Sequence, residues 1–132
     1  MARENDNDLW MVTAIIQEFK LDAVTLALEA LPYFGGMTVS DCRGFGQEKV
    51  EGGDTAGEAG APGGTRSGGG VEDFTPKIRL EIAVAGRVRA DAILAVIAQT
   101  AHTGRRGDGK IFVWKMSDAV RVRTFDVDAR AL

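Results

Sequence analysis

The chain has 132 residues, of which 45% are hydrophobic and 27% charged, as in an ordinary soluble globular protein with one domain. Its net charge of -3 and isoelectric point of about 5.2 argue against general nucleic-acid binding, which favours a basic face. The single cysteine, Cys42, cannot form an internal disulfide, which is compatible with a cytoplasmic protein.

The N-terminal residues 1–8 are polar and charged, and no apolar run behind them is long enough for a signal peptide or a membrane span. We therefore predict a mobile N-terminal tail over 1–8, one domain over 9–132, a cytoplasmic location and no direct insertion into a membrane.

Hydrophobic periodicity predicts strands and helices in the order β-α-β-β-α-β. The expected strands cover 10–16, 37–45, 77–84 and 110–116, the expected helices 21–31 and 89–101, and a short fifth strand 120–124. In the third strand, apolar residues alternate with Lys77, Arg79 and Glu81, which indicates one buried and one polar face. This order of elements is typical of the α+β class, as a ferredoxin-like βαββαβ sandwich.

A glycine-rich insertion, residues 50–70, separates the second and third strands and holds more than half of the chain's 17 glycines. It contains almost nothing that could fill a core, so it cannot recover the entropy of ordering, and we expect it to be mobile. Long insertions of this kind within one domain are usually functional.

The stretch 103–110, TGRRGDGK, has the G-x-x-x-x-G-K spacing of a nucleotide-hydrolase phosphate loop. Ile111 occupies the place of the Ser or Thr that would bind magnesium, and the stretch lies between a helix and a strand, the reverse of that loop's context. A Walker A motif is therefore excluded.

Phosphate binding of another kind is compatible with the same stretch. Its glycines can present backbone N–H groups as an anion nest, and Arg105, Arg106 and Lys110 add positive charge. Arg121 and Arg123, two apart on the predicted fifth strand, would point to one face. Spacing alone does not separate a phosphate site from a turn followed by a solvated basic edge.

Catalytic chemistry has little support in the sequence. His102 is the only histidine and lies at the end of a predicted helix, and Cys42 lies on a predicted strand. No cluster of His and Cys has the spacing of metal ligands. We predict no catalytic residue, no catalytic cofactor and no metal site.

Five ordered blocks of sequence resemble the PII signal-transduction proteins. They are VTAII-x-x-FK (12–20), GMTV-x-x-x-x-GFG (36–46), DF-x-PKI-x-x-EI (73–82), TG-x-x-GDGKIFV (103–113) and VRVRT (120–124). The resemblance implies a homotrimer with adenine-nucleotide sites in the clefts between subunits. It also implies that the insertion, at about 47–75, is a T-loop that docks onto a target protein.

The resemblance further implies which residues bind the nucleotide. Phosphate contacts are expected from the glycine loop and the C-terminal arginines, and adenine, ribose and T-loop-base contacts from the remaining positions. The full set is Ile15, Thr38, Gly44, Phe45, Gly46, Gln47, Glu81, Arg105, Arg106, Gly107, Asp108, Gly109, Lys110, Arg121 and Arg123.

Departures from the family pattern concern the effector. Gln47 stands where an arginine commonly meets the phosphates, so we expect ADP or AMP, with ATP less preferred than in typical relatives. Glu48 replaces the glutamine that chelates magnesium with 2-oxoglutarate, and its charge would repel that dicarboxylate, although Lys77 is retained. Binding of magnesium with 2-oxoglutarate is therefore doubtful, and another small anion such as bicarbonate is a possible signal.

Two classes of function are compatible with these residues. The first is a non-enzymatic adenine-nucleotide sensor that regulates a transporter or enzyme through its T-loop, in a bicarbonate or metal-efflux system rather than in nitrogen regulation. The second is a small phosphatase or other nucleotide-hydrolysing enzyme on the same fold. The second class needs a catalytic constellation, which the sequence does not contain.

Overall fold

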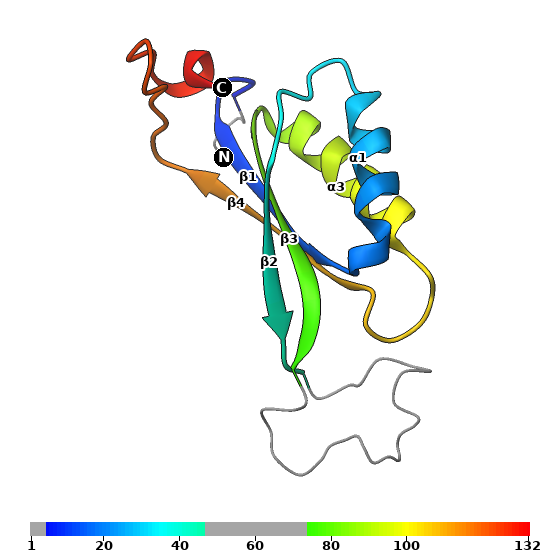
Figure 1. The fold of residues 1–132 in the computed structure, drawn as a ribbon. Helices are drawn as coiled ribbons and strands as arrows, with labels where there is room; N and C mark the ends of the chain where they lie inside the picture. Colours follow the sequence, from blue (N-terminus) through cyan, green and yellow to red (C-terminus); the bar gives the residue numbers. More distant parts are fainter. Residues whose placement is uncertain (1–4, 47–73) are drawn as a thin grey trace, which may run out of the picture.

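The computed structural model describes residues 5–46 and 74–132 (Figure 1). The segment 47–73, which holds Gln47, Glu48 and nearly all of the predicted T-loop, lies outside the described residues, as do residues 1–4. The predicted β-α-β-β-α-β order is confirmed. Its elements are β1 (Leu9–Ile16), α1 (Leu21–Glu29), β2 (Thr38–Gly44), β3 (Thr75–Ala85), α3 (Arg87–Ala101) and β4 (Gly109–Met116), with 3-10 turns η1 (Glu18–Lys20) and η4 (Asp128–Ala131).

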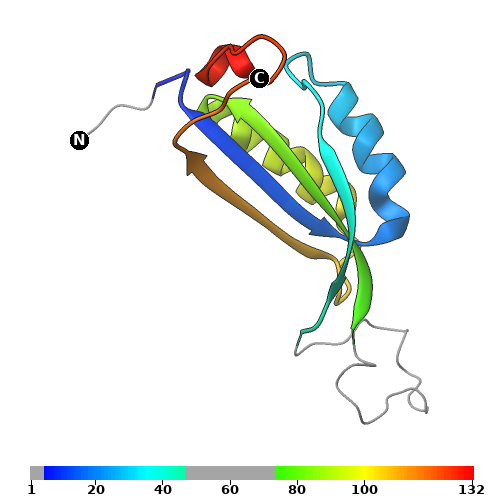
Figure 2. The ribbon, with the colours of Figure 1, turned by 60° about the vertical axis from the view of Figure 1, so that its left-hand side comes forward.

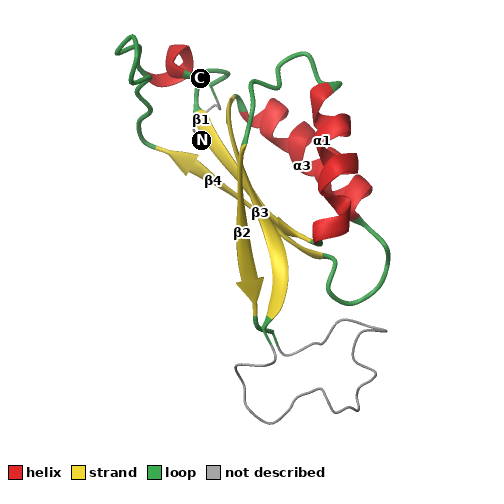
Figure 3. Cartoon of the chain, in the orientation of Figure 1, coloured by secondary structure: helices red, strands yellow, loops and turns green. Residues whose placement is uncertain are grey.

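The strands form one antiparallel sheet in the order β2-β3-β1-β4. The central strand β1 is paired on both edges, so that Val12 lies opposite Ile82 of β3 and Val113 of β4. Both helices pack on the same face of the sheet, and no helix of residues 5–46 and 74–132 lies on the other face (Figure 3). This arrangement confirms the α+β, ferredoxin-like fold class.

The hydrophobic core lies between the helices and the sheet, and the periodicity of the sequence explains it. Alternate residues of β1 and β3 point to the helices, and residues three to four apart on α1 and α3 point back. The buried apolar side chains include Val12, Ala14, Ile16, Val24, Leu28, Ile78, Leu80, Ile82, Val84, Ala90, Ile93 and Ile97.

Residues 5–8, which the sequence placed in the mobile tail, form a turn against the domain. The Asp8 amide donates to the Asn5 carbonyl oxygen over 2.9 Å, and the Gly86 amide donates to the Asp8 carbonyl oxygen over 2.7 Å. Lys115 Nζ lies 3.3 Å from an Asp8 carboxylate oxygen. This end of the tail is therefore joined to the start of α3 and to the end of β4.

The predicted fifth strand over 120–124 is wrong. Val120 makes a single bridge with Val127, and the residues between them form a tight turn. The Arg121 amide donates to the Asp126 carbonyl oxygen over 2.8 Å, and the Phe125 amide donates to the Arg121 carbonyl oxygen over 2.7 Å. These backbone groups are satisfied within the turn, so Arg121 and Arg123 do not share one face of a strand as predicted.

Several boundaries also differ by one or two residues, and two of them matter here. The helix α1 ends at Glu29 rather than at residue 31, and β3 begins at Thr75, so the last residue of the predicted T-loop belongs to the sheet.

Candidate functional site

The glycine loop, residues 103–109, joins the end of α3 to the start of β4. Gly104, Gly107 and Gly109 all have positive φ, at 88°, 96° and 111°. Gly109 tolerates no side chain for two reasons. Its positive φ is unfavourable for other residues, and an added Cβ would overlap the carbonyl oxygen of Ile15 and lie 2.9 Å from its carbonyl carbon. The glycine therefore lets the loop run directly against β1, where Ile16 lies opposite Gly109 and Ile15 opposite Lys110.

The Asp108 carboxylate holds the glycine loop in shape from within. It accepts hydrogen bonds from the Thr103 amide (2.7 Å), the Thr103 hydroxyl (2.6 Å), the Gly104 amide (2.9 Å) and the Gln17 side-chain amide (3.0 Å). Desolvation raises the pKa of this carboxyl, but the hydrogen bonds from Thr103, Gly104 and Gln17 outweigh it and lower the pKa to about 2. The negatively charged Asp108 carboxylate therefore stabilises the loop by accepting hydrogen bonds from it.

Lys77 ties the same loop to the base of the insertion. It lies on β3, and its Nζ donates a hydrogen bond to the Gly107 carbonyl oxygen. Although the alternation of β3 placed Lys77 on the polar face, only 8% of the residue is exposed. Burial lowers the pKa of its ammonium, and Asp108 and then Cys42 oppose that shift. The Lys77 amine is therefore a buried hydrogen-bond donor to the loop rather than a solvated charge.

Several predicted residues gather at this end of the sheet. Ile15 lies opposite Lys110, Gly44 lies opposite Thr75, and Gly44 approaches the Lys77 side chain, since an added Cβ would lie 3.7 Å from Lys77 Cγ. Phe45 and Phe74, the described residues that flank β2 and β3, contact each other with ring centroids 5.2 Å apart. Phe45, Gly46, Arg105, Arg106, Gly109 and Lys110 are exposed here.

This arrangement can bind an anion. The loop backbone turns at three positive-φ glycines, and the exposed cationic residues of the loop surround it. The Asp108 carboxylate of the loop accepts four hydrogen bonds, which partly offset the repulsion that its charge exerts on an incoming anion. Backbone N–H groups and side-chain cations together are the usual ligands of phosphate oxygens.

The structure does not bring the C-terminal arginines to the glycine loop. Gly109 begins β4, and Arg121 and Arg123 follow its other end, after eight strand residues that span about 25 Å. Figure 2 shows the C-terminal segment and the glycine loop at opposite ends of the sheet. Arg121 Nη2 donates instead to the Leu132 carbonyl oxygen over 3.0 Å.

Thr38 and Glu81 lie apart from the glycine loop as well. They face each other across β2 and β3, with Thr38 at the start of β2 and Gly44 at its end. Glu81 forms an ion pair with Arg79 over 2.9 Å. One chain thus presents three separate groups of predicted residues, at the glycine loop, at Thr38 and Glu81, and in the C-terminal segment, and Gln47 lies outside the described residues.

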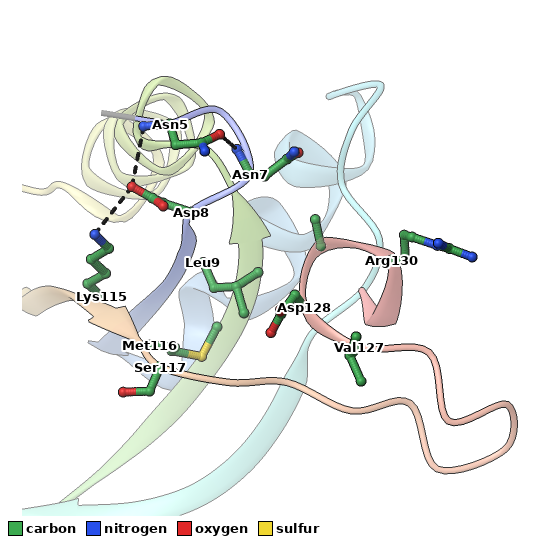
Figure 4. Close-up of a pocket in the computed structure, with 11 residues that line it drawn as sticks. Asn5, Asn7, Asp8, Leu9, Lys115, Met116, Ser117, Val127, Asp128 and Arg130 are labelled. Atoms are coloured by element: carbon green, nitrogen blue, oxygen red, sulfur yellow. Dashed lines mark hydrogen bonds and ion pairs between the residues drawn. The ribbon is translucent and has the colours of Figure 1, made fainter. Parts of the chain in front are cut away.

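A hollow of about 690 Å³ lies at the end of the sheet away from the glycine loop (Figure 4). Its wall combines the turn at Asn5 to Leu9, the end of β4 at Lys115 to Ser117, and Val127 to Arg130. The Asp8–Lys115 ion pair borders it. Of the predicted nucleotide-binding residues that the structure describes, none lines this hollow.

Two residues of the loop network were missed by sequence reasoning. Thr103 could have been found, because threonine and aspartate side chains in glycine-rich turns commonly hydrogen-bond to nearby groups of the same turn. Gln17 carried no such signal, since it is separated from Asp108 by 91 positions in the chain and only the fold brings them together.

Within 5–46 and 74–132 there is no group of three or more His, Cys, Asp or Glu residues that could hold a metal ion. In the same residues no helix is long and apolar enough to cross a membrane.

Comparison with known proteins agrees with this architecture. The family model described as Nitrogen regulatory protein P-II matches residues 9–126. The chain is 41% identical to a Nitrogen regulatory protein P-II of Rhizobium etli, over 92% of this chain and 98% of that protein. It is 34% identical to Nitrogen regulatory protein GlnK of Escherichia coli, with the same two coverages.

Solved structures show the same likeness. A crystal structure of Arabidopsis thaliana PII bound to citrate matches with a TM-score of 0.70 at 31% identity, over 95% of this chain and 92% of that one. A GlnK–ATP complex of B. subtilis matches in fold with a TM-score of 0.72 at 20% identity, over 97% and 99%. Given the sheet order, the glycine loop and these matches, the chain belongs to the P-II family of regulatory signal-transduction proteins.

Proposed function

We propose that this protein senses adenine nucleotides and regulates a target protein without catalysing a reaction. The observation that carries the proposal is the glycine loop, whose Asp108 carboxylate accepts hydrogen bonds from within the loop while Arg105, Arg106 and Lys110 are exposed on it. Family membership supports an adenine nucleotide as the anion, and so does the ATP of the B. subtilis GlnK complex, which has the same fold.

The nucleotide site is completed by a second copy of the chain. Arg121 and Arg123 lie about one strand length from the glycine loop of their own chain, so they reach a bound phosphate only across a subunit boundary. The helix-free face of the sheet supports self-association, because Phe112 and Trp114 of β4 are 50% and 44% exposed there. We propose a homotrimer, and light scattering that gives a monomer mass at micromolar concentration would refute it.

Calorimetry with ADP, AMP and ATP tests the site. Arg121→Ala removes a charged hydrogen bond worth roughly 1.5–3 kcal/mol, so its affinity should fall about tenfold or more. Arg89→Ala is the matched control, because Arg89 lies on α3 over the Tyr33 ring, on the helical side of the molecule. Equal affinities of Arg121→Ala and the wild type would exclude the proposed site.

The preference among ligands rests on two residues outside the described part of the chain. Gln47 lacks the charge of the arginine it replaces. We therefore propose that the protein binds ADP or AMP and that its preference for ATP over these nucleotides is weaker than in typical relatives. Glu48 should repel 2-oxoglutarate, since like charges roughly 4 Å apart at an effective dielectric of about 20 repel by about 4 kcal/mol before screening. Micromolar binding of 2-oxoglutarate to the MgATP-loaded protein would contradict this.

The target is proposed to be a transporter or enzyme that contacts residues 47–75. The same two substitutions are our reason for placing it in a bicarbonate or metal-efflux system, with bicarbonate as a possible effector. Co-purification with the chain and with a variant lacking 50–70 tests the docking segment, and equal recovery of one target by both would contradict it.

The alternative, a small phosphatase, is tested in the same samples by phosphate release. Asp108 is the carboxylate of the glycine loop, and a pKa of about 2 makes it a poor general base at neutral pH. We expect nucleotide to bind and remain intact, and steady turnover that Arg121→Ala abolishes would establish the enzyme instead.

A further inference from the structure

The C-terminal hairpin, residues 119–128, projects beyond the sheet and exposes apolar side chains. It is closed by the Asp128 amide donating to the Ala119 carbonyl oxygen over 2.8 Å and by the Val120–Val127 bridge. Val122 is 87% exposed and Phe125 79%. An apolar tip on a hydrogen-bonded hairpin is an expected feature of a contact surface rather than of a solvated turn.

Phe125 is held in an unfavourable backbone conformation. Its φ is 63°, in the left-handed region where glycine or asparagine would be preferred and a bulky side chain is disfavoured. The Phe125 amide still donates to the Arg121 carbonyl oxygen, and the Thr124 hydroxyl donates to Asp126 over 2.8 Å, so the turn is maintained around it. Strained positions of this kind cluster at functional sites, which directs attention to the Phe125 ring.

If the proposed function is accepted, the short distance along the chain between Arg123 and Phe125 limits where the Phe125 ring can lie. Arg123 and Phe125 are two residues apart, so their Cα atoms are at most about 7 Å from each other. When Arg123 meets a phosphate at the glycine loop of a second copy, Phe125 arrives at the same end of that copy's sheet. Phe19 of η1, 68% exposed, also follows the end of β1 there, but the ring pair of Phe45 and Phe74, which are 58% and 43% exposed, offers two aromatic rings already in contact.

We propose that Phe125 of one subunit packs against the Phe45–Phe74 ring pair of a second copy of the chain. The pair presents two tilted rings, at 41° to each other, which leaves both faces and edges available to a third ring. The contact would hold Arg121 and Arg123 in place over the neighbour's phosphate site. It would also join the hairpin of one subunit to the base of the insertion of the next.

Photo-crosslinking tests the contact directly. The full chain with Phe125 replaced by p-benzoylphenylalanine, saturated with ADP, should give an intermolecular crosslink that maps to the peptides containing Phe45 or Phe74. The same replacement at Val122 is the control for nonspecific capture, since that side chain is more exposed on the same hairpin. Crosslinks from position 125 that map to the helices, or only within one chain, overturn the proposal.

A double-mutant cycle gives a second measure. Phe125→Ala and Phe74→Ala should each weaken ADP binding, and their combined effect should fall short of the product by about three- to tenfold. Phe125→Gly should behave as Phe125→Ala in binding while relieving the strain, which separates lost contact from misfolding. If Arg121→Ala weakens ADP binding but the cycle shows no coupling, the ring contact is wrong and the nucleotide site stands. If Arg121→Ala leaves ADP binding unchanged, the proposed function itself fails.

Discussion

Gly109→Ala should damage both the fold and the glycine loop, and the structure gives the size of the effect. The φ of Gly109 is 111°, and the strain of an L residue in this region costs about 1–2 kcal/mol. The added Cβ also overlaps the Ile15 carbonyl oxygen and lies 3.3 Å from the Ile16 Cα, where backbone must move. Overpacking of this kind costs about 1–3 kcal/mol, so the free energy of unfolding should fall by about 2–5 kcal/mol.

Urea unfolding at one fixed protomer concentration measures the change, because the stability of an oligomer depends on that concentration. Gly104→Ala is the matched control. Its φ is 88°, but an added Cβ would be no closer than 3.7 Å to His102 Nε2, so it carries the strain without the collision. We expect Gly104→Ala to lose only about 1–2 kcal/mol. If the two variants are equally stable, the close approach of the loop to β1 is not what requires glycine at 109.

The remaining predictions concern the charges that hold the loop. The wild type should be more stable to urea than Asp108→Asn at neutral pH. The difference should shrink as the pH falls from about 4 to 2, because the folded pKa of about 2 lies below the ordinary value of 3.8. A constant difference across that range would contradict this prediction. Lys77→Met should lower the free energy of unfolding by about 1–3 kcal/mol, because it leaves the Gly107 carbonyl oxygen without its buried donor. Lys115→Met, at a half-exposed ion pair, should cost about 1 kcal/mol or less, and an equal loss in both variants would contradict a buried role for Lys77.

The sequence by itself determined the order of the elements and the character of the glycine loop. Strand and helix periods are local signals, and the apolar face that the alternation predicted on β3 is the face that packs in the core. The excluded Walker A motif also followed from local order, since the loop precedes a strand.

Pairing between distant segments decided the rest. The alternation of 120–124 is that of a strand, but a strand needs a neighbour for its backbone groups, and here those groups bond within a turn. Lys77 stands at a polar position of β3, yet the glycine loop covers it and accepts its hydrogen bond. The predicted strand over 110–116 already separated the glycine loop from Arg121 along the chain, but only the tertiary structure shows that the C-terminal segment folds back on itself, with Arg121 donating to the Leu132 carbonyl oxygen, and does not return to the loop.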